Sequence, residues 1–471
     1  MSYPYQEQIH EYLRSHQEEM VDLLKKLVSF PSVQQNVSEE YPFGKECAEV
    51  LEYIKALYES HGFETEAKPK DGYLLSYLGN GAKSLGLFAH ADVVAAGDDW
   101  VAGSPFSATE KDGFLIGRGV ADDKCAVVTS LYIMKMIKEL NLPIQSKIIS
   151  FTGISEETGM QDIENYVSKH KAPDFSLICD SEFPLYRGNK GMFQANATSK
   201  IPFKDVIDFH GGTSFNIILG KAYVTLKKKD GLYEALKEKE TDAIKVSMEN
   251  ENIRLYAEGL STHGAFPQGS LNAGFLLADL LSQCEILEES DRLQMEFIKD
   301  LMGTSYGEAL SIQSVDPDFG KLTCTNGIVR VKDGFISLVF DIRFGKTTDP
   351  EALKADLTSK FGAKNWEVTF SHTMSTHVIP KDLPTVQACL DVYKTYTGDT
   401  NAKTMVNAGG TYGRHLPCAV EIGTMVRREI PFPLPKGHGN LHQPDEALSI
   451  EGFLEATEMA MLMLLQCDKL I

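Results

Sequence analysis

The first part of the chain alternates short apolar runs with amphipathic stretches. The runs at residues 85–89, 147–152 and 175–179 are each bounded by polar or turn-forming residues, which is typical of buried β-strands. Residues 123–140 repeat apolar positions at the spacing of an amphipathic helix. This order of strand, helix and strand predicts an α/β sheet.

The two ends of the chain carry related patterns. Apolar residues at helical spacing predict helices over residues 6–30 and 45–60. Beyond residue 380 the pattern predicts a helix over 383–397, a strand over 419–423 and a long closing helix over 449–465. Because the last segment resembles the first, we infer that one domain is built from both ends of the chain.

The middle of the chain is less regular. Strands are predicted at residues 221–226, 253–257 and 335–343, with helices at 270–287 and 350–361. This arrangement is typical of a separate α+β domain.

The length of 471 residues supports this division, because one hydrophobic core rarely spans so many residues. The predicted fold class is therefore α/β, with a mixed sheet built from both termini and an inserted α+β domain. The expected boundaries are residues 1–186 and 379–471 for the first domain and 187–378 for the insertion.

Composition and charge narrow the function classes. The chain is 43% hydrophobic and 24% charged and has no run of ~20 apolar residues. Its formal charge of −20 repels nucleic acid and anionic membranes, so we expect neither as a partner. The cysteines form no Cys-x-x-Cys pair, and residues 1–20 lack the pattern of a signal peptide. We therefore expect reduced thiols and a cytoplasmic location.

Candidate chemistry lies mostly in segments that directly follow predicted strands. These motifs are His90-Ala91-Asp92, Asp122-Asp123-Lys124, Glu156-Glu157, Asp180 and His442. Imidazoles and carboxylates together can hold a pair of divalent metal ions and supply a general base.

Read in order, the motifs resemble those of the dinuclear metallopeptidases. This group includes aminoacylase, carboxypeptidase G, succinyl-diaminopimelate desuccinylase and the PepV-like Xaa-His dipeptidases, or carnosinases. The matching segments are Phe88-Ala-His90-Ala-Asp92-Val-Val, Gly117-Arg-Gly-Val-Ala-Asp122-Asp-Lys124, Glu156-Glu157, Cys179-Asp180-Ser-Glu-Phe-Pro184 and Asn440-Leu-His442. Asp180-Ser-Glu-Phe-Pro and Gly409-Gly-Thr411-Tyr-Gly-Arg414 look most like the PepV-type branch.

The resemblance implies a division of labour among the metal ligands. Asp122 bridges both ions, His90 and Asp180 complete the shell of one, and Glu157 and His442 complete the shell of the other. Zinc suits imidazole and carboxylate ligands best, and manganese or cobalt would also accept them.

Two further roles follow near the metals. The resemblance implies that Glu156 is the general base toward a metal-activated water and then delivers the proton to the leaving amine. Asp92 lies two residues from His90 in an extended segment, so it is placed to accept the other imidazole N–H. The resemblance also implies a cis peptide bond between Asp122 and Asp123.

The inserted domain is expected to act as a substrate-binding lid. By resemblance, His263 stabilises the tetrahedral oxyanion. The positions that match those holding the substrate's C-terminal carboxylate are Asn216, Arg343 and the turn Gly410-Thr411-Tyr412, with Asn216 aligning only loosely. The insertion is long enough for one chain to complete the site, so we expect a monomer.

One position departs from the family pattern. Where Asp-Asp-Lys is usually followed by glycine, this chain has Cys125. A buried, small apolar role and a redox-sensing thiol are both open readings.

The sequence therefore predicts a dinuclear metal-dependent dipeptidase that hydrolyses short unblocked peptides. One alternative is an N-acyl-amino-acid deacylase or desuccinylase on the same scaffold. The other is a non-catalytic peptide-binding protein.

Overall fold

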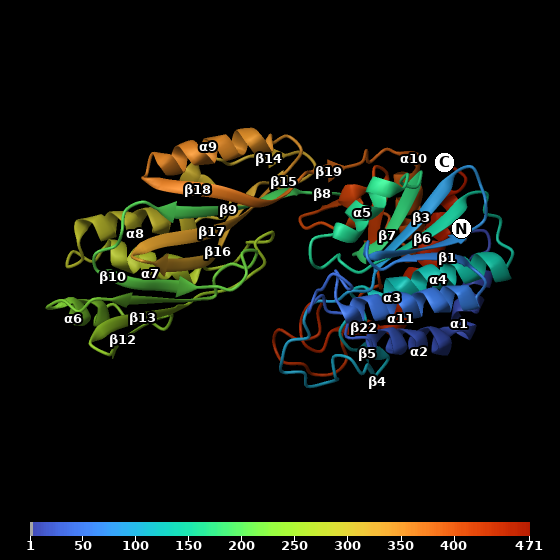
Figure 1. Cartoon of the computed structure of the whole chain (residues 1–471), viewed down its shortest axis with the longest axis horizontal. Coiled ribbons are helices and arrows are strands. Elements are labelled where there is room, and N and C mark those ends of the chain that lie inside the picture. The colour runs from blue at the N-terminus through green and yellow to red at the C-terminus, as the bar shows by residue number, and fades with distance from the viewer. Residues whose placement is uncertain (1–2) are drawn as a thin grey trace. The chain divides into compact units, whose positions relative to one another are not determined.

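The computed structural model describes residues 3–471, which form two compact units (Figure 1). Unit 1 comprises the described residues up to 189 together with 378–471, and unit 2 comprises residues 190–377. Each unit has its own hydrophobic core. The junctions lie within a few residues of the boundaries that the sequence suggests.

Unit 1 contains elements from both parts of the chain. Its helices are α1 (Gln6–Ser15), α2 (Gln17–Val28), α3 (Lys45–Ser60), α4 (Lys124–Glu139), α5 (Gln161–Lys169), α10 (Pro384–Thr397), α11 (Ile450–Cys467) and the 3₁₀ turn η2 (Tyr412–His415). The strands of its main sheet are β1 (Glu64–Lys68), β2 (Tyr73–Leu78), β3 (Ser84–His90), β6 (Lys147–Gly153), β7 (Phe175–Ser181), β8 (Tyr186–Asn189), β19 (His377–Val378), β20 (Met405–Asn407) and β21 (Ala419–Gly423). A small second sheet consists of β4 (Thr109–Lys111), β5 (Phe114–Ile116) and β22 (Ala447–Ser449).

The main sheet is mixed, in the order β1-β2-β6-β3-β7-β21-β8-β19, with β20 paired to β8. At its centre β6, β3, β7 and β21 run parallel. Beyond β6, β2 pairs antiparallel with β6, and β1 pairs antiparallel with β2. Because the carboxyl ends of parallel strands share one edge, residues at these ends are brought together.

Both faces of this sheet are covered. Along β3, Leu85 and Leu87 join the core beneath α3, α4 and α11, whereas Phe88 joins a second core with residues of α5 and η2. This alternation follows from the two-residue period of a strand. Figure 1 shows α1 to α4 and α11 gathered on one side of the sheet and α5 on the other.

Unit 2 is an antiparallel sheet with helices. The sheet order is β12-β13-β11-β10-β16-β17-β9-β18. Its strands are β9 (Gly191–Ser199), β10 (Val206–Gly211), β11 (Lys221–Leu226), β12 (Ile244–Glu249), β13 (Asn252–Glu258), β16 (Thr323–Lys332), β17 (Phe335–Phe344) and β18 (Trp366–Met374), and β14 (Val315–Asp316) pairs with β15 (Gly320–Lys321). The helices are α6 (Leu232–Lys237), α7 (Ala273–Ser282), α8 (Glu289–Met302), α9 (Pro350–Gly362) and the 3₁₀ turn η1 (Glu308–Leu310).

The predicted fold class is confirmed: the mixed sheet uses strands from both ends of the chain, and the insertion is α+β. Within residues 3–471, no helix is long and apolar enough to span a membrane.

Two predicted helices differ from the structure. The single helix expected over 6–30 is two helices, because His16 leaves helical geometry (φ −108°, ψ 9°) and its Nδ1 hydrogen-bonds the Tyr12 carbonyl. The helix expected over 270–287 is shorter, because Asn272 caps α7 by accepting from the Gly274 N–H and the helix ends at Ser282.

Candidate metal centre

The motif residues gather at the carboxyl ends of the parallel strands in unit 1. His90 is the last residue of β3 and is paired in register with Gly153, the last residue of β6. Glu156 and Glu157 follow β6, and Asp180 is the next-to-last residue of β7. The parallel topology therefore assembles residues that are far apart in the sequence.

Two clusters of potential ligands share Asp122. One consists of His90, Asp122 and Asp180, and the other of Asp122, Glu157 and His442; in each, the donor atoms lie within 4.8 Å of one another. His90 Nε2 lies 3.1 Å from Asp122 Oδ1, and His442 Nε2 lies 3.0 Å from Asp122 Oδ2. The two oxygens of one carboxylate thus face two different imidazoles.

The remaining distances fit the same geometry. His90 Nε2 is 3.9 Å from Asp180 Oδ1, and His442 Nε2 is 3.2 Å from Glu157 Oε1. Two ligand atoms that are each about 2.1 Å from a tetrahedral ion lie about 3.4 Å apart. The donor atoms are therefore spaced as two adjacent divalent ions require.

The charges of the centre point to cations as well. Although burial opposes it, the carboxylates of Asp122 and Asp92 hold the pKa of His90 well above its usual value. Hydrogen bonds to Asp122 and Glu157 raise the pKa of His442 to about 11. Burial, reinforced by neighbouring carboxylates, raises the pKa of Asp180 well above its usual range. Buried like charges of this kind are stabilised when cations lie between them.

Asp92 connects His90 to the loop that carries the glutamates. His90 Nδ1 lies 3.0 Å from the Asp92 carbonyl and 3.4 Å from its carboxylate, which leaves Nε2 turned toward Asp122. The Asp92 carboxylate also accepts the backbone N–H groups of Glu156 and Glu157, at 3.3 and 3.1 Å. One buried side chain therefore positions an imidazole and the glutamate loop together.

Glu156 lies beside the clusters without belonging to either. Burial, and then the negative charge of Asp180, raises the pKa of Glu156 well above its usual range. A carboxylate in this setting accepts a proton readily, as a general base must.

The chain around Asp122 adopts the expected backbone. The Asp122-Asp123 peptide bond is cis, as predicted. The ammonium group of Lys124 is buried and donates to the carbonyls of Leu27 and Phe30, which ties this segment to the end of α2. Cys125 is fully buried and burial raises the pKa of its thiol, so it is a packed residue as expected, without the thiolate character of a redox sensor.

Sequence reasoning missed the residues that hold Asp122 in place. Glu446, which is fully buried, accepts the N–H groups of Ala121 and Asp122 at 3.0 and 3.2 Å and pairs with Arg118 at 2.5 Å. Its neighbour Asp445 accepts three backbone N–H groups of residues 101–103. The available signal was an acidic pair three residues after His442 and directly before the apolar strand β22.

The substrate residues expected in the insertion lie in unit 2. Asn216 and His263 are neighbours, because Ile217 pairs with His263 and the Gly264 N–H donates to the Asn216 carbonyl at 2.7 Å. The Ala265 N–H donates to His263 Nδ1 at 3.2 Å, which places the proton of the neutral ring on Nε2. Arg343 is 3% exposed and its guanidinium pairs with Asp341 at 2.8 Å.

The turn Gly410-Thr411-Tyr412 belongs to unit 1. A side chain at position 410 would meet the Arg414 guanidinium at 2.0 Å, so the close approach of Arg414 requires glycine. The Tyr412 side chain is fully buried, and its hydroxyl donates to Asp162 at 2.6 Å. The tyrosine side chain is therefore committed to Asp162 and is not a candidate for contacting a ligand.

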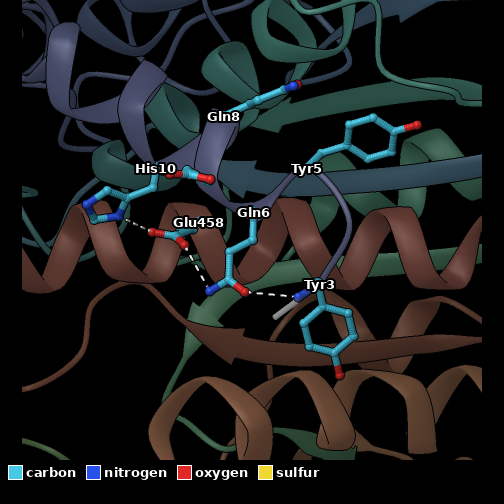
Figure 2. A pocket seen from close by; sticks show the side chains of 7 residues that line it. Tyr3, Tyr5, Gln6, Gln8, His10 and Glu458 are labelled. Atoms are coloured by element: carbon cyan, nitrogen blue, oxygen red, sulfur yellow. Dashed lines mark hydrogen bonds and ion pairs between the residues drawn. The ribbon is translucent and has the colours of Figure 1, made fainter. Parts of the chain in front are cut away.

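A cavity of about 570 Å³ lies elsewhere in unit 1, between α1 and α11 (Figure 2). Its buried Glu458 accepts from His10 Nδ1 at 2.9 Å, the Tyr396 hydroxyl at 3.0 Å and Gln6 Nε2 at 3.4 Å. These contacts join α1 to α11, so we interpret the carboxylate as a packing anchor.

The paired imidazole and carboxylate clusters, at the carboxyl edge of an α/β sheet, are typical of a metal-dependent hydrolase. The model of peptidase family M20/M25/M40 matches residues 86–466, and the chain belongs to this family. It is therefore a hydrolase that acts on peptide bonds.

Similar proteins span nearly the whole chain. Beta-Ala-Xaa dipeptidase of Lactobacillus delbrueckii subsp. lactis is 29% identical over 453 residues, covering 92% of this chain and 94% of the relative. YtjP of Bacillus subtilis (strain 168), which carries the provisional name of a dipeptidase, is 28% identical over 431 residues, covering 89% and 90%. Human carnosine dipeptidase 1 shares the fold, with a TM-score of 0.61 at 16% identity over 100% of both chains.

The contacts of Glu446 generate a testable prediction. Glu446→Gln removes the partner of the buried Arg118 and replaces one acceptor oxygen with a donor, so Asp122 loses its fixed position. We expect metal affinity, measured by competition with a chelating dye, to fall about 10- to 100-fold.

Asp468→Asn is the matched control. Asp468 is a buried carboxylate that accepts the N–H groups of Gln145 and Ser146, both at 2.9 Å, at the opposite end of β6. It should leave metal affinity unchanged. An equal loss in both variants would show that Glu446 acts only through general stability.

The raised pKa values predict the pH dependence of metal loading. The imidazoles of His90 and His442 hold protons in the metal-free protein and must lose them to become ligands. We therefore expect proton release on metal binding and an apparent affinity that weakens as the pH falls. Titration calorimetry in buffers of different ionisation enthalpy measures both.

The His10→Gln variant, which changes a histidine outside both clusters, should titrate like the unmodified protein. Proton uptake, or an affinity independent of pH, would contradict the assignment of His90 and His442 as ligands.

Proposed function

We propose that this protein is a dinuclear metal-dependent dipeptidase of the PepV type, acting on short unblocked peptides. The observation that carries the proposal is Asp122, whose two carboxylate oxygens face His90 and His442 from opposite sides, with Glu156 beside them. The two relatives named above, both of which carry dipeptidase names, support the same substrate class.

The proposed ligand set assigns His90 and Asp180 to one ion, Glu157 and His442 to the other, and Asp122 to both. Zinc is the expected metal, with manganese or cobalt as alternatives, since one imidazole and two carboxylates at each position suit all three. Bound ions would polarise the scissile carbonyl and lower the pKa of a water molecule.

Glu156 moves the protons in this proposal. Its raised pKa suits a group that takes a proton from the attacking water and then passes it to the leaving amine. Asp92 positions both partners of this step, because it contacts His90 and accepts the N–H groups of Glu156 and Glu157.

Unit 2 recognises the rest of the substrate in this proposal. His263 donates its Nε2–H to the oxyanion, a role that its Nδ1 contact with the Ala265 N–H supports. Arg343, whose guanidinium is oriented by Asp341, and Asn216 are the candidates in unit 2 for holding the C-terminal carboxylate. The Gly410-Thr411 backbone is the candidate in unit 1 for the same role.

The general-base role makes a direct prediction. Glu156→Gln keeps the shape of the side chain but cannot take up a proton, so we expect kcat for dipeptides to fall about 10²- to 10⁴-fold. Metal content, measured by elemental analysis, should stay at the level of the unmodified protein because Glu156 belongs to neither cluster.

Glu164→Gln, at an exposed position on the helix that follows the same loop, should leave both quantities unchanged. Unaltered turnover in Glu156→Gln would sink the mechanism.

Substrate class is tested by comparing Leu-Gly and Met-Gly with N-acetyl- and N-succinyl-amino acids. A free ammonium group donates hydrogen bonds that the carboxylates of the centre accept, whereas an acetyl group has no donor. We expect kcat/KM to be at least about 10-fold higher for the dipeptides.

Preference for the acylated set would assign the chain to a deacylase or desuccinylase. Absence of bound divalent ions after loading would favour a non-catalytic peptide-binding protein.

A further inference from the structure

A cavity of about 260 Å³ lies in unit 1, and the proposed function does not use it. Its walls come from the end of β7, from α10, from the segment after β21 and from the loop before His442. The apolar side chains that line it are Phe183, Tyr393, Met425, Val426 and Leu441. We call it the 183/441 pocket.

The 183/441 pocket is continuous with the metal centre along the chain. Ser181, one of its lining residues, directly follows Asp180, and Leu441 directly precedes His442. Asp180 and His442 belong to different clusters. The pocket lining therefore includes the immediate chain neighbour of one potential ligand in each cluster.

The pocket has a fixed aromatic wall. The rings of Phe183 and Tyr393 are stacked, with centroids 5.7 Å apart and an interplanar angle of 18°. A side chain at position 423 would meet the Phe183 ring at 2.6 Å, so Gly423 leaves room for this ring. Stacked rings held in this way offer a preformed apolar surface.

The lining carries no net charge. Its two charged side chains, Glu182 and Arg427, are paired with each other at 2.5 Å. A charged ligand group would have to compete with this existing ion pair for a partner, whereas an apolar group gains directly from burial against the aromatic wall.

The size indicates what fits. Pockets for whole drug-sized molecules have volumes of about 300–1,000 Å³. A cavity of about 260 Å³ is instead suited to a single amino-acid side chain.

We propose that the 183/441 pocket binds the side chain of the substrate's N-terminal residue and selects large, uncharged, apolar side chains. This inference rests on the proposed dipeptidase function. There the leaving residue is held by its carboxylate, so the residue that provides the scissile carbonyl is the one beside Asp180 and His442. Its side chain leaves the carbon atom bonded to that carbonyl, so a pocket lined by the chain neighbours of Asp180 and His442 is the candidate to receive it.

The proposal predicts a preference that depends on one position of the peptide. With the C-terminal glycine held constant, Leu-Gly, Met-Gly and Phe-Gly should exceed Gly-Gly in kcat/KM by about 10- to 200-fold. Lys-Gly and Glu-Gly should fall below the apolar set. β-Alanyl-glycine, which has no side chain, should gain nothing from the pocket.

Two variants change the pocket in opposite ways. Leu441→Ala removes part of the wall, and Met425→Trp fills the space. In both, the Leu-Gly to Gly-Gly ratio of kcat/KM should fall at least about 10-fold. Leu470→Ala, which truncates an exposed leucine of unit 1 outside the pocket, should keep the original ratio.

Binding provides a second readout. In the inactive Glu156→Gln background, calorimetry should show that Met425→Trp lowers the affinity for Leu-Gly relative to that for Gly-Gly. The expected factor is similar to the fall in the kcat/KM ratio. Metal content is measured in every variant because Leu441 adjoins a ligand, and if Leu441→Ala loses metal, Met425→Trp decides the outcome.

Failure of the proposed function can be distinguished from failure of the pocket proposal. If the metal-loaded protein hydrolyses none of the dipeptides, the proposed function is wrong, and the pocket proposal falls with it. If it hydrolyses them but the ratio stays the same in Met425→Trp, the pocket proposal alone is overturned.

Discussion

The carboxylate of Asp122 is the group on which the rest of the centre depends. Its two oxygens lie 3.1 and 3.0 Å from the imidazoles of His90 and His442, so its position sets the separation of both clusters. Glu156, Glu157 and Asp180 add three more buried carboxyl groups nearby, and burial raises the pKa of each. A fold can keep such a group together only if the backbone around it is held rigidly, because the carboxylates repel each other.

The structure meets this demand with buried carboxylates that accept backbone N–H groups. Asp92 holds the Glu156-Glu157 loop, and Glu446 holds Ala121 and Asp122. Each of these acceptors comes from a different part of the chain from the loop it fixes. The ligands are therefore positioned by long-range contacts that form only when the parallel sheet and the C-terminal segment are both in place.

The difference between local sequence patterns and these long-range contacts explains which elements could be predicted from the sequence. The central strands β3, β6 and β7 are buried on both faces, so each is a continuous apolar run that pattern alone reveals. The edge strand β1, which has no fully buried residue, and its neighbour β2 were not predicted. Strands β9 and β18 of unit 2, which mix buried with more exposed positions, were not predicted either. The break at His16 depends on a local hydrogen bond to Tyr12, which periodicity does not record.

The same distinction applies to the site. His90, Glu157 and Asp180 stand at or shortly after strands that the pattern predicts, and the resemblance of the ordered motifs to a known family added Asp122 and His442 to the proposed set. Arg118 and Glu446 are 328 residues apart and became visible only as a buried pair in three dimensions. The 183/441 pocket likewise combines two motif segments, around Asp180 and His442, with residues of α10 and of the segment after β21 that carry no motif, so it became visible only in three dimensions.

The distribution of these parts between the two units has a functional consequence. All five proposed metal ligands, the proposed base Glu156 and the 183/441 pocket belong to unit 1, whereas His263, Asn216 and Arg343 belong to unit 2. In the proposed function, metal loading and selection of the N-terminal side chain then depend on unit 1, and Asn216 and Arg343 of unit 2 contribute to recognition of the C-terminal residue. Substitutions within unit 2 can alter the preference for the C-terminal residue without disturbing the backbone contacts that hold Asp122. Specificity at the two ends of a peptide can therefore change independently, while the chemistry between them stays fixed.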